Sequence, residues 1–335
     1  MSDKLISVDN LSVSFTTDEG RFKAVDHVSF YIDYGEVLGI VGESGCGKSV
    51  TALSMMRLVP CPPGSIDNGR IVYKGRDLLA LDKKELRSIR GQGISMIFQE
   101  PLSALSPLQT IGRQMEEVVR IHTDVSVREA RRISHTWLEK VKIPDAAERL
   151  HAYPYQLSGG MQQRIMIAMA LMLSPDLIIA DEPTTALDVT IQAQVFKLIR
   201  EMKEERASIL LITHDLGVVW DMCDRVVVMY ASRIVETGSV TDIFTRPAHP
   251  YTRGLLDSIP KLGDGSGKRL KAIGGNVPSP MDYPSGCHFR DRCPHAFERC
   301  AAENPQFVDV SHGHQAACFI AGELVEKGNK DEQSL

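Results

Sequence analysis

The sequence lacks any long hydrophobic run. Its longest apolar stretch, IMIAMALML at residues 165–173, is far shorter than the roughly 20 apolar residues that a membrane-spanning helix needs. The N-terminal stretch MSDKLISVDNLSVSF has neither a basic start nor an apolar segment of signal-peptide length, so we expect no export. Any membrane association is expected to be peripheral or through a partner, and stable disulfides are not expected in such a cytosolic chain.

An excess of positive charge is also absent. The chain has 43 acidic and 38 basic residues and a net charge of -5, so its composition does not favour nucleic acid as a partner, and we expect none. The length of 335 residues exceeds one ordinary compact domain and is short for three. This favours one large domain with a smaller appendage.

The first segment that carries chemistry is EVLGIVGESGCGKSVTALSMMRL, residues 36–58. An apolar run, a glycine-rich turn and helix-compatible residues follow one another, and GESGCGKS matches the phosphate-loop pattern GxxxxGK[ST]. Glycines let the backbone wrap around phosphate oxygens, whose charge is complemented by N–H groups and the helix N-terminus. Lys48 is expected to reach the β- and γ-phosphates, and Ser49 to bind Mg²⁺.

The alternative interpretation of this loop is a glycine-rich turn without a ligand. We predict nucleotide binding instead, because the strand and helix context is correct. Cys46 is expected to fill space, with no chemistry of its own thiol. The residues of the loop expected to bind ATP are Gly42, Glu43, Ser44, Gly45, Cys46, Gly47, Lys48, Ser49 and Val50.

A second nucleotide element is LIIADEPTTALD, residues 177–188. Apolar residues that end in two acids describe a buried strand whose carboxyl end presents carboxylates, where open α/β sheets bind their ligands. Asp181 is expected to hold Mg²⁺, and Glu182 to act as the general base toward the attacking water. Taken alone, such a pair is more often a solvated strand end, but the phosphate loop upstream favours the catalytic interpretation.

Between these elements lies YQLSGGMQQRIMIAMALML. Ser158 is a good helix N-cap, and the two glycines after it permit close approach of another molecule. A largely buried helix is expected to follow. The alternative is a flexible loop that only begins a helix.

LSGGMQQR, residues 157–164, resembles the signature motif of the ATP-binding cassette (ABC) superfamily. GESGCGKS, Gln99 in MIFQEP, ADE at residues 180–182, TALD with Asp188, and His214 in LITHD complete the ordered motif set of that family. The resemblance implies an α/β fold: a P-loop ABC ATPase cassette with a RecA-like core, an antiparallel β part and a helical subdomain. A small cysteine-rich C-terminal domain is expected to follow it.

The resemblance also implies roles for matching residues. Two cassettes of this family pair head to tail, so the signature of one contacts the ATP held by the other. His214 is expected to contact the γ-phosphate and to be catalytic together with Glu182, and Asp188 is the expected D-loop residue. Gln99 would join the ATP and metal site to the surface that meets the membrane subunits. The Mg²⁺ ligands are expected to be Ser49, Gln99 and Asp181, and the signature residues Ser158, Gly159, Gly160 and Gln162.

An aromatic residue that stacks on adenine is expected early in a cassette. Phe15 in LSVSFTT is the best positional match, and Phe22 is the alternative. A period-2 pattern around Phe15 could equally bury its ring in a strand.

RPAHPYTRGLLDSIP, residues 246–260, resembles the segment that follows the cassette in D-type ATP-binding subunits of bacterial dipeptide and oligopeptide permeases. The similarity runs from about residue 4 to about residue 320. We therefore expect an ABC ATPase domain over 4–260, with a helical subdomain at about 100–173. A C-terminal domain is expected over 261–325 and a disordered tail over 326–335.

This resemblance implies an ATP-hydrolysing subunit of an importer, peripheral on the cytoplasmic face of the inner membrane. The expected partners are a second, different ATPase subunit, two transmembrane permease subunits and, through the complex, an extracytoplasmic binding protein that delivers peptide. Related branches import nickel chelates, glutathione or oligosaccharides. Soluble ABC ATPases that do not transport are disfavoured, because the chain has one motif set and no sustained heptads. A regulatory cassette without turnover is disfavoured by Glu182 and His214.

Four of the seven cysteines gather near the end of the chain, in CHFRDRCPHAFERC and QAACF. Their spacing is wider than that of usual zinc sites, and iron–sulfur clusters tolerate varied spacing, so spacing alone leaves the metal open. The family resemblance implies a [4Fe-4S] cluster; zinc and unliganded thiols are the alternatives, and a structural staple is favoured over a redox sensor. The expected ligands are Cys287, Cys293, Cys300 and Cys318, with His288, His295, His312 and His314 as nearby substitutes if the metal is zinc.

Overall fold

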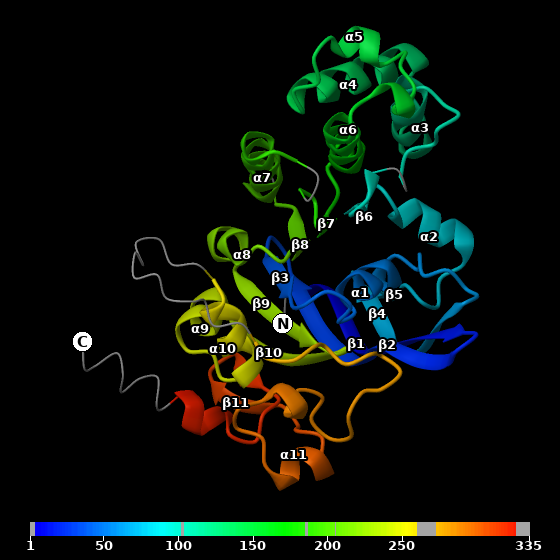
Figure 1. Ribbon diagram of the computed structural model, residues 1–335. Helices are drawn as coiled ribbons and strands as arrows, with labels where there is room; N and C mark the ends of the chain where they lie inside the picture. Colours follow the sequence, from blue (N-terminus) through cyan, green and yellow to red (C-terminus); the bar gives the residue numbers. More distant parts are fainter. Residues whose placement is uncertain (1–3, 102–103, 185–186, 205, 260–272, 326–335) are drawn as a thin grey trace. The chain divides into compact units, whose positions relative to one another are not determined.

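A computed structural model of the chain describes residues 4–101, 104–184, 187–204, 206–259 and 273–325 (Figure 1). The chain divides into two compact units. Among the described residues, the first unit comprises those of Asp33–Val37 and Ala80–Ile212, and the second comprises those of Lys4–Ile32, Leu38–Leu79 and Thr213–Leu335. Both units are assembled from segments that are distant in sequence, so neither boundary coincides with a single linker.

The first unit contains a parallel sheet in the order β8-β7-β6. β6 (Ile94–Ile97), β7 (Leu177–Asp181) and β8 (Ser208–Ile212) are buried at every position. Continuous runs of Ile, Leu and Ala are typical of strands covered on both faces. The carboxyl end of β7 therefore delivers Asp181 from within the core.

The described part of the first unit also contains helices. They are α2 (Lys83–Ile89), α3 (Ile111–His122), α4 (Val127–Lys140), α5 (Ala146–Arg149), α6 (Gly159–Leu171) and α7 (Val189–Glu204), with a 3-10 turn at Pro154–Gln156. Capping residues stabilise the N-termini of several of these helices. Asp82 and Glu85 form a capping box at α2, and the Ser126 hydroxyl caps α4 by accepting a hydrogen bond from the Glu129 N–H.

The second unit contains an antiparallel sheet in the order β2-β1-β4-β5. Its strands are β1 (Lys4–Thr17), β2 (Gly20–Asp33), β4 (Gly64–Tyr73) and β5 (Arg76–Asp77). β1 pairs with β4 along most of its length, from Ile6 opposite Tyr73 to Phe15 opposite Gly64. This is the antiparallel part that the sequence predicts.

A second sheet of this unit has the order β11-β12-β10-β9-β3. β3 (Val37–Val41) and β9 (Arg225–Tyr230) are parallel, while β10 (Arg233–Ser239), β11 (Val308–Ser311) and β12 (His314–Ala316) are antiparallel to their neighbours. The helices of the unit are α1 (Lys48–Met55), α8 (Leu216–Met222), α9 (Val240–Thr245), α10 (Pro250–Asp257) and α11 (Glu298–Ala302), with a 3-10 turn at Arg290–Arg292.

A separate cysteine-rich domain at the end of the chain, expected from the sequence, is not shown. Its described residues belong to the second unit, because β12 pairs with β10 and places Ala316 opposite Glu236. Ala316 and Ala321 share one buried cluster with Ala248, which precedes α10. A tail too small to bury its own core thus completes a core that the rest of the unit supplies. Residues 260–272 and 326–335 lie outside the described residues.

Among the residues that the structure describes, we find no helix with the length and apolar character that crossing a bilayer requires.

Candidate nucleotide site and C-terminal contacts

The phosphate loop follows β3, whose five residues are all buried. Two glycines are required by its path. Gly42 has φ +150° and a Cβ there would lie 2.2 Å from the Met229 carbonyl oxygen; Gly47 has φ +103° and its Cβ would lie 2.3 Å from the Ala24 carbonyl oxygen. Because L side chains rarely adopt these conformations and would collide with backbone, only glycine fits at either position.

Lys48 begins α1 and its side chain is folded onto the loop. Its Nζ donates to the Gly42 carbonyl oxygen at 2.8 Å and to the Glu43 carbonyl oxygen at 3.0 Å, and the residue is 7% exposed. Thr51 closes the first turn of the helix, since its hydroxyl donates to the Gly47 carbonyl. The loop thus holds a cation at its centre, with Ser44 and Gly45 exposed at its tip.

Cys46 is fully buried inside the loop. Burial raises the pKa of its thiol, although nearby Lys48 acts in the opposite direction. A neutral buried thiol acts as a small apolar group. This agrees with the space-filling role expected from the sequence.

Asp181, Glu182 and Gln99 meet in the first unit. Asp181 ends β7 and is 3% exposed. Glu182 follows with φ 46°, and its N–H donates to the Ile212 carbonyl oxygen at 2.9 Å. Gln99 lies beyond β6, the neighbouring strand, and its Nε2 donates to Glu182 Oε2 at 3.2 Å. A non-glycine residue in the left-handed region is uncommon and frequent at functional sites.

His214 belongs to the second unit, where it is exposed directly before α8. Asp215 caps that helix, because its carboxylate accepts hydrogen bonds from the Gly217 and Val218 N–H groups. Its own N–H donates to the Thr213 hydroxyl. The local turn is therefore held by the residues on both sides of His214.

The signature segment presents Ser158 and Gly159 to solvent. The Ser158 hydroxyl accepts a hydrogen bond from the Met161 N–H at 3.3 Å, which caps α6. A Cβ on Gly159 would meet nothing within 4 Å, and one on Gly160 would meet only Leu187 Cδ2 at 3.6 Å. Open space at an N-terminus of a helix suits the approach of an anion.

Gln162 is placed differently from the rest of the signature. It is 7% exposed, and its Nε2 donates to the carbonyl oxygens of Pro154 and Leu157 at 2.8 and 3.2 Å. It therefore holds the loop before α6. Gln163 and Arg164 were missed by sequence reasoning. Gln163 donates to the Pro183 carbonyl next to Glu182, and Arg164 donates to the carbonyls of Val141 and Lys142.

Asp188 is exposed, and its Oδ1 accepts hydrogen bonds from the N–H groups of Thr190 and Ile191, both at 3.0 Å. It thereby caps α7. Phe15 and Phe22 stack on each other, with ring centroids 5.9 Å apart and an angle of 22° between the rings. Both rings are partly exposed, so the two candidates for the adenine contact form one aromatic surface.

The predicted metal centre is wrong. In the part of the chain that the structure describes, no three His, Cys, Asp or Glu side chains come together as metal ligands. Cys287, Cys293, Cys300 and Cys318 line a cavity of about 20 Å³, which has room for about one water molecule and not for a four-iron cluster. Burial raises the pKa of Cys287, Cys293 and Cys318, the last to about 12, whereas metal ligands are thiolates.

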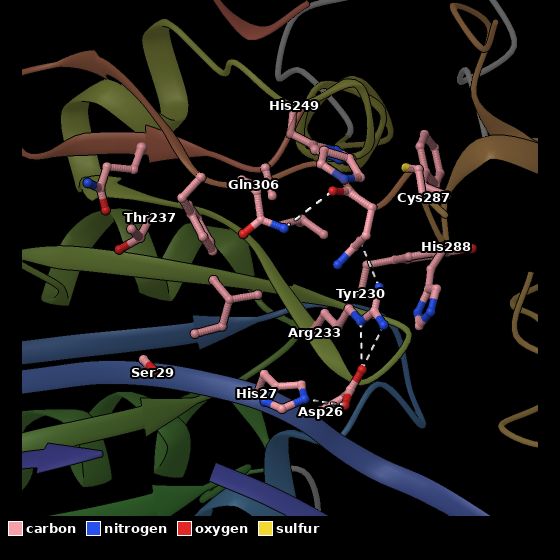
Figure 2. A pocket seen from close by; sticks show the side chains of 18 residues that line it. Asp26, His27, Ser29, Tyr230, Arg233, Thr237, His249, Cys287, His288 and Gln306 are labelled. Carbon is pink, nitrogen blue, oxygen red and sulfur yellow. Dashed lines mark hydrogen bonds and ion pairs between the residues drawn. The ribbon is translucent and has the colours of Figure 1, made fainter. Parts of the chain in front are cut away.

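A larger pocket of about 320 Å³ lies in the second unit (Figure 2). Its polar wall includes Asp26, which pairs with Arg233 at 2.7 Å, and its other walls include Tyr230, His249 and Cys287. Arg233 also donates to the Asn304 side chain at 2.7 Å. Residues of β2, β10 and the C-terminal segment therefore line one pocket. Arg233 contacts both Asp26 of β2 and Asn304 of the C-terminal segment.

Two contacts to the phosphate loop were also missed. The Glu43 N–H donates to the Tyr251 hydroxyl at 2.8 Å, and the Arg292 guanidinium bonds both carboxylate oxygens of Glu43 at 2.7 and 3.0 Å. Tyr251 stands in HPYT, which the sequence offered only as a family resemblance. Arg292 stands between Cys287 and Cys293 and was not among the residues that the sequence singled out.

Comparison with known proteins assigns both halves of the sequence. The family described as ABC transporter matches residues 25–185. The family described as oligopeptide/dipeptide transporter, C-terminal region, matches residues 235–300. The second match covers HPYT and continues to Cys300.

Relatives extend over nearly the whole chain. A probable peptide ABC transporter ATP-binding protein of Sinorhizobium fredii is 50% identical over 325 residues, covering 97% of each chain. The dipeptide transport ATP-binding protein DppD of Bacillus subtilis is 49% identical, again over 97% of each chain. The oligopeptide transport ATP-binding protein OppD of Escherichia coli is 46% identical, covering 95% of this chain and 94% of the relative.

A solved structure is also similar. The ATP-binding cassette MJ0796, solved as a dimer in a post-hydrolysis state with ADP and Pi, aligns with a TM-score of 0.64 and 26% identity, covering 70% of this chain and 98% of its own. The P-loop cassette fold predicted from the sequence is thereby confirmed. With relatives of about half identical sequence along their full length, the chain belongs to the ABC transporter family of ATP-binding proteins, in the group that carries the oligopeptide/dipeptide transporter C-terminal region.

Proposed function

We propose that this chain is the ATP-hydrolysing subunit of an ABC importer for dipeptides or oligopeptides. The observation that carries the proposal is the identity of 46–50% along nearly the full length of three peptide-transport ATP-binding proteins, C-terminal region included. The phosphate loop, the acidic pair after β7 and the exposed signature supply the chemistry such a subunit needs. The match to the oligopeptide/dipeptide transporter C-terminal region favours peptide over the other cargoes named above.

In this proposal the phosphate loop binds the triphosphate. Lys48, whose Nζ already bonds two loop carbonyls, has the charge and position to exchange a carbonyl for a phosphate oxygen. The backbone N–H groups from Gly42 to Val50 complement the remaining charge. Phe15, stacked with Phe22, offers an aromatic face for the adenine.

Hydrolysis is assigned to Glu182 and His214. Water attacks the γ-phosphorus, the bond to the β–γ bridging oxygen breaks, and Glu182 accepts the proton of the water. The Gln99 amide bonds the Glu182 carboxylate and would orient it. His214, exposed beside the cap of α8, would contact the γ-phosphate.

We propose Ser49, Gln99 and Asp181 as the Mg²⁺ ligands, because each side chain has an oxygen of the kind that this ion prefers. When bound, Mg²⁺ neutralises charge on the β- and γ-phosphate oxygens. Asp181 is fixed for this role by its buried strand, at 3% exposure.

The exposed Ser158 and Gly159 and the half-buried Gly160 are proposed to contact ATP held by a partner cassette. The capped N-terminus of α6 and the open space over Gly159 support this. Gln162 and Arg164 would position the segment through their bonds to backbone carbonyls. Asp188 would serve as the D-loop residue of the same interface.

We further propose that the partners are a second, different ATPase subunit, two transmembrane permease subunits and an extracytoplasmic binding protein. The chain would act peripherally at the cytoplasmic face of the inner membrane. The cassette is assigned to residues 4–260, with a helical subdomain at about 100–173, and the cysteine-rich C-terminal region to 261–325. The match of residues 235–300 to the oligopeptide/dipeptide transporter C-terminal region supports a role of this region in the transporter.

The test is reconstitution of the complex in vesicles, with uptake of a labelled dipeptide measured beside ATP turnover. Glu182→Gln should keep ATP binding and lose nearly all hydrolysis and uptake, because the proton acceptor is removed. The matched control is Glu201→Gln, an exposed glutamate on α7, which should hydrolyse ATP like the parent. Substantial turnover by Glu182→Gln would refute the assigned base, and ATP-dependent uptake of a different solute alone would refute the cargo.

A further inference from the structure

Glu43 of the phosphate loop is held by two residues that follow the cassette motifs in the sequence. Tyr251, on α10, accepts a hydrogen bond from the Glu43 N–H at 2.8 Å. Arg292, in the C-terminal region, makes a bidentate ion pair with the Glu43 carboxylate at 2.7 and 3.0 Å. Backbone and side chain of one loop residue are therefore both fixed from outside the loop.

Arg292 is fixed at its own end. Its side chain is 5% exposed, and Nε donates to the Gly274 carbonyl oxygen at 2.9 Å. The guanidinium also lies 5.7 Å from the ring centre of Tyr230 and 6.0 Å from that of Phe289. The hydrogen bond to Glu43 raises the pKa of Arg292 further, so its charge is permanent. A half-buried bidentate pair of this kind is held in a more definite geometry than a single-contact surface ion pair.

Tyr251 is equally constrained. It is fully buried, and its ring packs against Tyr230 at 4.6 Å and Phe289 at 5.4 Å between centroids. Its N–H donates to His249 Nδ1 at 3.0 Å. Burial lowers the pKa of His249 to about 4, which keeps that nitrogen an acceptor at neutral pH.

Hydrogen bonds also connect the segment before Tyr251 to β12, the last strand of the unit. The carboxylate of Glu236, on β10, accepts hydrogen bonds from the N–H groups of Ala248 and His249 at 2.6 and 2.9 Å. His314 on β12 lies 2.8 Å from the same carboxylate through Nε2. A continuous set of polar contacts thus connects β12, the HPYT segment and Glu43.

We propose that Arg292 and Tyr251 are positioning residues for ATP binding, which hold the phosphate loop through Glu43 and so tie nucleotide affinity to the C-terminal region. This rests on the proposed function, since it assigns a role within the same ATP site. Two physical effects support it. Fixing a loop in its binding conformation removes an ordering cost from binding. Pairing the Glu43 carboxylate also cancels a negative charge beside the place where phosphate must bind.

The test measures affinity of the full-length chain for mant-labelled ATP with Mg²⁺. Arg292→Gln should raise the Kd by roughly five- to twentyfold, because the loop is released and Glu43 becomes an unpaired anion. The loss should shrink at high salt, where the repulsion of phosphate by that carboxylate is screened. A substitution that only destabilises the fold would lower the unfolding midpoint. It would leave the Kd of the folded chain, and the salt dependence of that Kd, at the parent values.

A double-mutant cycle isolates the contact. Arg292→Gln introduced into a Glu43→Gln background should change the Kd much less than it does in the parent chain. Arg292→Lys restores the charge and loses the bidentate geometry, so its Kd should lie between those of the parent and Arg292→Gln. Tyr251→Phe, which leaves the Glu43 N–H without its acceptor, should raise the Kd without the salt dependence.

The control is Arg299→Gln, in the same region. Arg299 is 57% exposed and pairs with Glu303 at 2.8 Å, so its loss should leave the Kd at the parent value. Equal Kd values for the parent and Arg292→Gln would overturn the inference, as would full additivity in the cycle. If Arg292→Gln does not fold, Arg292→Lys decides, and a parent-like Kd there overturns it. Failure of the parent itself to bind ATP would refute the proposed function instead.

Discussion

The buried carboxylate of Glu236 gives a sharp stability prediction for the second unit. Glu236 is 0% exposed and accepts from two backbone N–H groups, while His314, 1% exposed, lies 2.8 Å from Oε1. Because a carboxylate only accepts hydrogen bonds, Nε2–H of His314 is the donor. Glu236→Gln replaces one acceptor oxygen by a donor NH₂ group, which then faces a donor.

The magnitude follows from the burial of the site. Removing one partner of a buried, hydrogen-bonded charge network costs about 3–5 kcal/mol, and each hydrogen bond to a charged group contributes about 1.5–3 kcal/mol. A unit of this size loses about 2–4 °C of thermal midpoint per kcal/mol. We therefore expect Glu236→Gln to lower the midpoint of the second unit by roughly 6–20 °C.

The assay uses the distribution of tryptophan. The chain has two tryptophans; Trp220 lies on α8 in the second unit and is 51% exposed, whereas Trp137 lies on α4 in the first. In a Trp137→Phe background, fluorescence during heating reports the second unit alone. The control Glu298→Gln changes an exposed glutamate of α11 and should shift the midpoint little. A Glu236→Gln midpoint equal to that of the control would refute the reasoning.

Three further outcomes are expected. Lys48→Ala should weaken binding of mant-labelled ATP about 10–100-fold, because a charged donor to the phosphates is lost; unchanged affinity would exclude Lys48 from the site. Gly47→Ala should abolish that binding, since its Cβ would lie 2.3 Å from the Ala24 carbonyl oxygen at φ +103°, and a functional variant would contradict the loop path. Asp26 is partly desolvated, which alone would raise its pKa, but hydrogen bonds from Lys23 and from Arg233, the latter drawn in Figure 2, hold the pKa below its ordinary value. Its stabilising effect is therefore present above about pH 4 and lost as pH falls through the folded pKa, so Asp26→Asn should flatten the acid dependence of the unfolding midpoint, and an unaltered dependence would contradict this.

The prediction of a metal centre came from the family resemblance, because the spacing of the cysteines left the metal open. Spacing tells how far apart four thiols lie along the chain, and it does not tell whether the loops between them present thiolates to a common centre. Here Cys287 and Cys318 lie in an environment whose burial favours the neutral thiol. The tail is instead held by pairing of β12 with β10 and by the Arg292–Glu43 ion pair.

Gln162 shows that a correctly identified motif does not fix the contacts of each of its side chains. The family resemblance placed it, with Ser158, Gly159 and Gly160, among the signature residues that contact a partner's ATP. Membership of a motif, however, does not tell which of its side chains bond the backbone of their own loop. Ser158 and Gly159 are exposed, while Gln162 turns inward to the carbonyls of Pro154 and Leu157.

The sequence by itself determined the cassette and the identity of its nucleotide motifs. GESGCGKS, ADE and LSGGMQQR carry their chemistry in short segments, where spacing dictates local backbone geometry: Gly42 and Gly47 adopt positive φ, and Ser158 caps its helix. Only the tertiary structure decided that Tyr251 and Arg292 meet Glu43 across 208 and 249 positions of sequence. Such contacts depend on how the whole unit packs, because burial and strand pairing bring distant residues together and no local pattern encodes the meeting.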